Sequence, residues 1–273
     1  MNFPLVSVVL PVYNAEKYIV ECLESIAAQS YANWELIIIN DGSTDSSEKL
    51  IEIFIKNCSN HVQYLISKHK GLPFCLNLGI THAQGKYIAR MDADDVMLET
   101  RLEQQVNFME KKPETGILGT NFVEIDENGK ELGTIKMPVG NDLIKQKFLT
   151  MCAIAHPTVM ARKEILIANK YLDKYPFPED YELWTRLIET TNFENLQIIL
   201  LKKRFHKNEI TYKAGSFFIF DALKLMIAFN KRYNDKLPIY VILKYSLMML
   251  MTNRMRYFLR IQKLRYIKLM SKI

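Results

Sequence analysis

The segment Gly85-Lys-Tyr-Ile-Ala-Arg-Met-Asp-Ala-Asp-Asp95 joins a short apolar run to three carboxylates within four residues. Like charges so close together repel one another, so a fold gains nothing from them unless a cation or hydrogen-bond donors compensate. If the chain stays extended here, Asp92 and Asp94 share one side. A hard divalent ion completed by substrate phosphates fits this arrangement. The alternative is a solvated turn that caps a helix near Glu99, but the place directly after a buried strand favours the metal–phosphate site.

The same alternation of apolar runs and helical periodicity extends back to residue 5. The expected strands span residues 6–12, 34–39, 62–66 and 86–91, and apolar residues at helical spacing lie between them. This order predicts an α/β fold with a Rossmann-like, mostly parallel sheet flanked by helices. Ligands bind beyond the carboxyl ends of the strands in such sheets. Polar clusters follow three of the expected strands: Tyr13-Asn14, Asp41-Gly-Ser43 and Asp92-Ala-Asp-Asp95.

The second half of the chain is less regular. In the first half, we expect Asn14 to cap the helix that follows the first strand. The residues around Asp126-Glu-Asn-Gly129 carry a hairpin signature. The expected elements are strands over 116–125 and 131–136, a helix over 142–151, a strand over 156–161 and a helix over 178–189.

Composition limits the class of protein. The chain has 273 residues, of which 49% are hydrophobic and 24% charged, which excludes a disordered or collagen-like chain. Its four cysteines form no C-x-x-C pair, which argues against a zinc ribbon or a disulfide scaffold. We read no signal peptide and no membrane-spanning stretch, and therefore expect a cytoplasmic protein.

Charge is distributed unevenly along the chain. Residues 1–200 hold 19 basic and 27 acidic residues, whereas residues 201–273 hold 17 basic and 3 acidic residues. We therefore expect an acidic globule followed by a basic helical tail that seeks a polyanion, either nucleic acid or an anionic membrane surface. If residues 254–270 are helical, one arc is apolar and basic residues flank it, which favours a membrane surface and no nucleic acid. The residues of this arc are Met255, Phe258, Leu259, Tyr266, Leu269 and Met270, and Tyr257, Ile261 and Leu264 lie opposite.

No glycine-rich phosphate loop of either common type is present. If a nucleotide binds, a metal held by carboxylates must neutralise its phosphates instead. Asp41 could accept a hydrogen bond from a base or a ribose hydroxyl, or it could be an ordinary turn residue. His156 is expected to be structural, and Trp184 could either stack on an acceptor sugar or belong to the core.

Taken together, five motifs resemble the inverting family 2 glycosyltransferases of the GT-A fold, of the bacterial polysaccharide-biosynthesis type. The resemblance covers roughly residues 5–190. The motifs are residues 6–14, residues 34–45, residues 85–95, His156-Pro-Thr-Val-Met160, and Pro178-Glu-Asp-Tyr-Glu-Leu-Trp-Thr-Arg186.

The resemblance implies a role for each matching residue. It places Asp41 on the uracil of the donor, Asp92 near the ribose and the metal, and Asp94 as a ligand of Mg²⁺ or Mn²⁺. It makes Asp180 the general base. The other residues implied to bind the nucleotide are Pro11, Val12, Tyr13, Glu16 and Ala93.

Two positions depart from the family pattern. His69 stands where an asparagine is common, and Leu76 stands where an arginine is often found. The contacts that residues 69–76 make with the nucleotide are therefore left open.

The implied activity is metal-dependent, inverting transfer of a hexose or N-acetylhexosamine from a nucleotide-sugar, of which a UDP-sugar is the first choice. The acceptor would be a glycan or a lipid-linked glycan, reached from the inner face of the plasma membrane. We expect residues 1–205 to form the GT-A domain, with a nucleotide-binding half at 1–97 and an acceptor half at 98–205, and residues 206–273 to form the tail. Two alternatives stay open: a nucleotidyltransferase, and a non-catalytic binder of nucleotide-sugars or nucleic acid.

Overall fold

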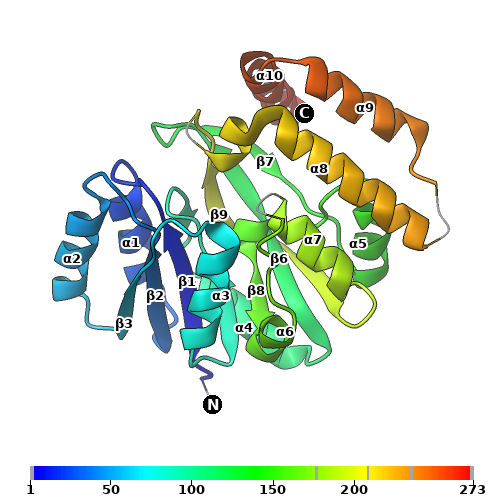
Figure 1. Ribbon diagram of the computed structural model, residues 1–273. Coiled ribbons are helices and arrows are strands. Elements are labelled where there is room, and N and C mark those ends of the chain that lie inside the picture. The colour runs from blue at the N-terminus through cyan, green and yellow to red at the C-terminus, as the bar shows by residue number, and fades with distance from the viewer. Residues whose placement is uncertain (1–2, 176–177, 208, 234–235, 271–273) are drawn as a thin grey trace.

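A computed structural model of the chain (Figure 1) describes residues 3–175, 178–207, 209–233 and 236–270. The side chains of residues 210–214 and 265–270 lie outside that description.

One sheet of nine strands runs through the described residues, in the order β3-β2-β1-β4-β8-β6-β9-β5, with β7 paired to β6. The first four strands in this order are parallel to one another, and β8 then runs antiparallel to both β4 and β6. The strands are β1 Val6–Val12, β2 Trp34–Asn40, β3 Val62–Ile66, β4 Tyr87–Arg90, β5 Val96–Met97, β6 Thr115–Ile125, β7 Glu131–Ile135, β8 Met160–Arg162 and β9 Asn192–Arg204.

Helices cover both faces of this sheet (Figure 1). They are α1 Ile19–Ala27, α2 Ser47–Asn57, α3 Leu72–His82, α4 Arg101–Lys111, α5 Asn141–Phe148, α6 Lys163–Ala168, α7 Glu179–Leu187, α8 Ile210–Arg232, α9 Ile239–Leu250 and α10 Asn253–Met270. The predicted α/β class, with a mostly parallel sheet flanked by helices and a helical C-terminal region, is confirmed.

Alternation along the strands divides the core into two layers. In β1, Val8 and Leu10 pack with residues of α1, α2 and α4, whereas Val9 faces α3 on the other side of the sheet. Gly79 lets α3 approach closely, because a Cβ at this position would lie 2.6 Å from a methyl group of Val9. The polar loops that follow β1, β2 and β4 are therefore held at one edge of a rigid sheet.

The C-terminal helices contribute to the same core. Met226 and Phe229 of α8 and Val241 of α9 are buried in the layer that contains α5 and α7. In α10, Leu264 is buried, and the ring of Tyr257 stacks on Phe205 at a centroid distance of 4.8 Å. The boundary predicted between residues 205 and 206 stays a prediction.

Three local expectations need correction. Asn14 does not cap the first helix, because α1 begins at Ile19 and the Asn14 Oδ1 instead accepts a hydrogen bond from the backbone of Thr44 at 2.8 Å. The strand predicted over 156–161 begins with a 3₁₀ turn, His156–Thr158, and only Met160–Arg162 pairs as a strand. Pro157 has no N–H to donate to a ladder, which accounts for the turn. The long strand β9 was not predicted at all.

Within the described ranges, no helix has both the length and the apolar character needed to span a bilayer.

Candidate active site

Asp41 lies in the loop that follows β2, and it is buried. Its two carboxylate oxygens accept hydrogen bonds from the backbone N–H groups of Lys70 and Gly71, both at 2.8 Å. Gly71 has a φ of +91°, which favours glycine, and it directly precedes α3. Burial alone would raise the pKa of Asp41, but the nearby Ser67 hydroxyl and these backbone N–H groups hold it below its usual value. Asp41 is thus an ionised acceptor at the edge of the sheet.

Two aromatic rings stand beside this carboxylate. The ring of Tyr13 lies 4.2 Å from the ring of His69, measured between centroids, and Tyr13 is 48% exposed. The Nδ1 of His69 is 3.7 Å from the Asp41 carboxylate. His69 therefore faces the expected base-binding residues at the position where the chain departs from the family pattern.

The other residues predicted to bind the nucleotide lie in β1, in the loop that follows it, and after β4. Val12 has a buried side chain, and its carbonyl oxygen accepts a hydrogen bond from the Asp41 N–H at 2.8 Å. Glu16 is exposed and accepts a hydrogen bond from the Ser46 N–H at 2.9 Å, which ties this loop to the start of α2. Pro11 pairs with β2, and Ala93 packs against the core layer that contains α1.

Asp92, Asp94 and Asp95 come together after β4. Ligand atoms of the three carboxylates lie within 4.8 Å of one another. Asp92 forms an ion pair with Arg90, and its side chain is 30% exposed. Asp95 is buried, and its Oδ1 accepts the backbone N–H of Arg204 at 2.7 Å. Burial and then the charges of Asp94 and Asp92 raise the pKa of Asp95 well above its usual value, which favours its neutral form.

His206 completes this cluster, and it was not predicted from the sequence. Its Nε2 lies 2.8 Å from Oδ2 of Asp94. Arg204, at the end of β9, anchors the segment through a hydrogen bond from its Nε to the Asp94 carbonyl oxygen at 2.9 Å. His206 and Asp94 are separated by 112 residues, so no local pattern in the sequence could pair them.

Glu179 and Asp180 form the first turn of α7. The Asp180 Oδ1 accepts a hydrogen bond from the backbone N–H of the next residue, Tyr181, at 2.7 Å. The Asp180 Oδ2 lies 3.7 Å from the Cys152 Sγ. Burial, followed by the charge of Glu179, raises the pKa of Asp180. Burial also raises the pKa of Glu179 to about 7. A raised pKa makes the Asp180 carboxylate a stronger proton acceptor than an exposed aspartate.

His156 holds Glu179 in place. Its Nδ1 lies 3.2 Å from the Glu179 Oε1, and its Nε2 lies 2.8 Å from the Tyr171 hydroxyl. Burial and the nearby Arg90 lower the pKa of His156 to about 3, so the ring is neutral at physiological pH. These contacts agree with the structural role expected for His156.

Trp184 belongs to the core. Its side chain has 0% exposure, and its ring packs edge-on against His156 with centroids 5.9 Å apart. This burial removes the alternative in which Trp184 stacks on a sugar.

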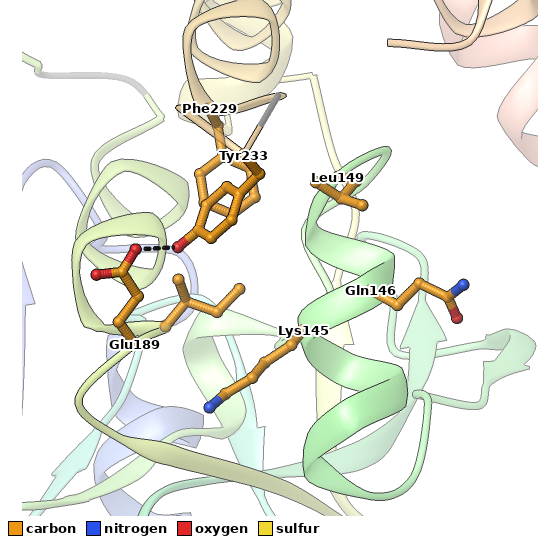
Figure 2. Close-up of a pocket in the computed structure, with 7 residues that line it drawn as sticks. Lys145, Gln146, Leu149, Glu189, Phe229 and Tyr233 are labelled. Carbon is orange, nitrogen blue, oxygen red and sulfur yellow. Dashed lines mark hydrogen bonds between the residues drawn. The ribbon is translucent and has the colours of Figure 1, made fainter. Parts of the chain in front are cut away.

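A separate cavity of about 410 Å³ opens between α5, the end of α7 and α8. The Tyr233 hydroxyl donates a hydrogen bond to Glu189 at an oxygen–oxygen distance of 2.6 Å (Figure 2). Lys145 points into the cavity from α5. As far as the structure is described, none of the predicted nucleotide, metal or base residues lines this cavity. It is distinct from the acidic cluster.

The sequence matches the model of glycosyl transferase family 2 over residues 7–168. The chain belongs to glycosyltransferase family 2. Its relatives in this family include the O-antigen biosynthesis glycosyltransferase WbnJ of Escherichia coli, which is 33% identical over 77% of this chain and 83% of its own length. The amylovoran biosynthesis glycosyltransferase AmsE of Erwinia amylovora is 31% identical over 77% of this chain and 79% of its own length. Both of these relatives are named for polysaccharide biosynthesis, and its membership of the family makes this chain a transferase.

Solved structures share the fold. TarS of S. aureus in complex with UDP-GlcNAc superimposes with a TM-score of 0.66 at 20% identity, over 82% of this chain and 66% of TarS. The mannosyltransferase PcManGT of Pyrobaculum calidifontis, in complex with GDP-Man and Mn²⁺, gives a TM-score of 0.62 at 17% identity, over 93% of this chain and 72% of PcManGT. The chain spans only 30% of the length of an uncharacterized glycosyltransferase of Rickettsia bellii that it also matches. The likeness to these structures establishes the GT-A fold of this family 2 member.

Proposed function

We propose that this family 2 enzyme transfers a sugar, with inversion and with the help of a divalent metal, from a UDP-sugar to a hydroxyl of a growing cell-surface glycan. The observation that carries the proposal is the position of Arg90. This buried arginine pairs with Asp92 after β4, and its charge also acts on Glu179, the neighbour of Asp180. The positive charge of Arg90 therefore acts both on the donor-side motif, which contains Asp92, and on the acceptor-side motif, which contains Glu179.

The donor base would lie against Asp41 and Tyr13. An ionised carboxylate at this edge can accept the N–H of a uracil, and an exposed tyrosine ring can pack against the base. TarS has been crystallised with UDP and with UDP-GlcNAc, which supports a UDP-sugar, whereas PcManGT was crystallised with GDP-Man. The division into a donor half at residues 1–97 and an acceptor half at 98–205 is part of this proposal.

The acidic cluster fits a hard divalent cation. Asp92 and Asp94 offer partly exposed carboxylates, and Mg²⁺ and Mn²⁺ prefer such oxygen ligands. Asp94, with Asp92 beside it, would hold the ion, which when bound would offset the negative charge that develops on the leaving diphosphate. His206 orients the Asp94 carboxylate through its hydrogen bond.

Asp180 would take the proton from the acceptor hydroxyl as that oxygen attacks the anomeric carbon. The bond to the diphosphate breaks on the opposite side of the carbon, which inverts its configuration. The backbone N–H of Tyr181 and the thiol of Cys152 contact the Asp180 carboxylate, and the charges of Glu179 and Arg90 also act on it, so this carboxylate is held ready before the acceptor arrives.

The acceptor would be a lipid-linked glycan at the inner face of the plasma membrane, where the basic tail binds anionic lipid. In α10, the described part of the predicted apolar arc is exposed: Met255, Phe258 and Leu259. The other members of the arc, Tyr266, Leu269 and Met270, lie outside the described side chains. Removing the tail is not a clean test, since α8 supplies Met226 and Phe229 to the core.

Donor choice and turnover test this proposal together. Thermal unfolding of the protein is followed with UDP-, GDP- and dTDP-sugars in the presence of Mn²⁺, because a true donor stabilises the fold by about 2.7 kcal/mol at a hundred times its dissociation constant. Release of the nucleoside diphosphate is then measured for the donor that stabilises. Stabilisation by a UDP-sugar with release of UDP supports the proposal. Stabilisation without any release would make the chain a non-catalytic binder.

A further inference from the structure

Helix α9 presents a row of large apolar side chains to the outside of the molecule. Figure 1 shows α9 on the outside, beside α8. The row, which we call the outer arc, has side chains that are 56–85% exposed. It consists of Ile239, Tyr240, Leu243, Leu247 and Leu250. With a turn of about 100° per residue, these five positions fall within an arc of about 100° on the helix.

The opposite side of α9 is fixed to the acceptor side of the enzyme. Val241 is buried in the core, and Tyr245 packs against the same layer. Burial and, to a smaller extent, the nearby Cys152 thiol raise the pKa of Tyr245 to about 12, which places Tyr245 close to Cys152. Cys152 in turn contacts Asp180. Since its inner side is held there, α9 cannot rotate to bury the outer arc.

The charge around α9 selects among possible occupants of the outer arc. Residues 236–273 contain nine Lys and Arg residues and no Asp or Glu. Lys244 is exposed about 40° beyond Tyr240 on the helix, and Lys236 is exposed just before α9 begins. Two copies of this chain that met through the outer arc would bring these like charges together. An anionic lipid surface offers both acyl chains for the apolar arc and phosphates for the lysines.

The length of α9 sets its orientation on a bilayer. Twelve residues make a helix of about 18 Å, shorter than the hydrocarbon core of about 30 Å. Such a helix lies in the interface with its apolar side among the acyl chains. We propose that α9 is the membrane-docking helix of this enzyme and that it holds the acceptor site around Asp180 at the surface of an anionic bilayer. This inference deepens the proposed function, because it rests on an acceptor that is linked to lipid.

Flotation of the full-length protein with vesicles tests the inference. The vesicles are made of phosphatidylcholine with or without phosphatidylglycerol, and the variant is Leu243→Glu/Leu247→Glu. The matched control, Ile53→Glu/Ile167→Glu, places the same two charges on exposed apolar positions of α2 and α6. A second variant, Lys236→Glu/Lys244→Glu, changes the charge near α9 and leaves the outer arc intact. It keeps the inference testable if the first variant does not fold.

We expect the wild type and the control to float with phosphatidylglycerol vesicles. The bound fraction of the α9 variant should fall about tenfold or more, since two charges enter the apolar side of an interfacial helix. The lysine variant should bind less and lose most of its dependence on phosphatidylglycerol and salt. Release of UDP from the donor in the absence of lipid should be the same in all four proteins, so a failure of the proposed function is seen separately in the wild type.

Three results would overturn the inference: flotation of the α9 variant like that of the wild type, absence of flotation of the wild type, or a wild-type dimer in lipid-free solution that the α9 variant converts to a monomer. The last result would assign the outer arc to self-association.

Discussion

Replacing Arg90 by methionine should destabilise the protein and weaken its binding of UDP. The Arg90 side chain is 6% exposed, and it pairs with Asp92, whose side chain is 30% exposed. Removing one partner of a fully buried ion pair costs about 3–5 kcal/mol, because the other charge stays buried without compensation. Since Asp92 still reaches water, we expect the free energy of unfolding to fall by about 2–4 kcal/mol. UDP should bind more weakly, because Asp92 loses the contact that orients it.

Urea denaturation of Arg90→Met measures the loss of stability. Lys86→Met is the control. Lys86 lies four residues before Arg90 and forms an ion pair with Glu110, and the two side chains are 46% and 40% exposed. Such an exposed pair contributes about 1 kcal/mol or less. A double-mutant cycle with Asp92→Asn should give an interaction energy of about 1–3 kcal/mol between Arg90 and Asp92. Additive single effects, together with an Arg90→Met variant as stable as Lys86→Met, would refute the reasoning.

The other predictions concern Asp180, Glu179 and Trp184. Asp180→Asn should leave UDP affinity nearly intact while lowering turnover by about 10²–10⁴-fold, as measured by steady-state kinetics; activity within tenfold of wild type would deny Asp180 the role of base. Burial raises the pKa of Glu179 from 4.5 to about 7, so its stabilising contribution is full below pH 4.5 and is lost as pH rises through 7. Relative to Glu179→Gln, the wild type should therefore lose stability across that window in urea denaturation at a series of pH values, and a difference that is independent of pH would contradict the assignment. Trp184→Ala should lower the free energy of unfolding by about 3–5 kcal/mol, as large buried aromatics do, and a loss below 1 kcal/mol would show that Trp184 is not a core residue.

Much of the fold could be predicted because the first half obeys simple rules. Its buried parallel strands appear as continuous apolar runs, and polar residues mark the edge where β1, β2 and β4 end. The acidic cluster was visible for the same reason, since Asp92 and Asp94 follow directly on an apolar strand. The 13 residues of β9 escaped prediction because Glu194, Gln197 and Lys202 interrupt its apolar pattern.

The site was only partly predictable, because periodicity reports which face a residue occupies and not which residue it meets. Arg90 reads as an ordinary strand residue, yet it links Asp92 to the neighbourhood of Glu179. His206 stands in a short connection after β9, and only the pairing of β9 with β5 and β6 brings it to Asp94. The outer arc of α9 was likewise hidden, since the apolar residues of this helix look like core residues until their exposure is known.

The most direct test of the central claim is a calorimetric titration of UDP into the wild type and Asp94→Asn, each with and without Mn²⁺. If Asp94 holds the metal that neutralises the diphosphate, Mn²⁺ should tighten UDP binding to the wild type and have little effect on the variant, because an amide is a much poorer ligand for a hard cation. Equal dependence on Mn²⁺ in both proteins would contradict the claim.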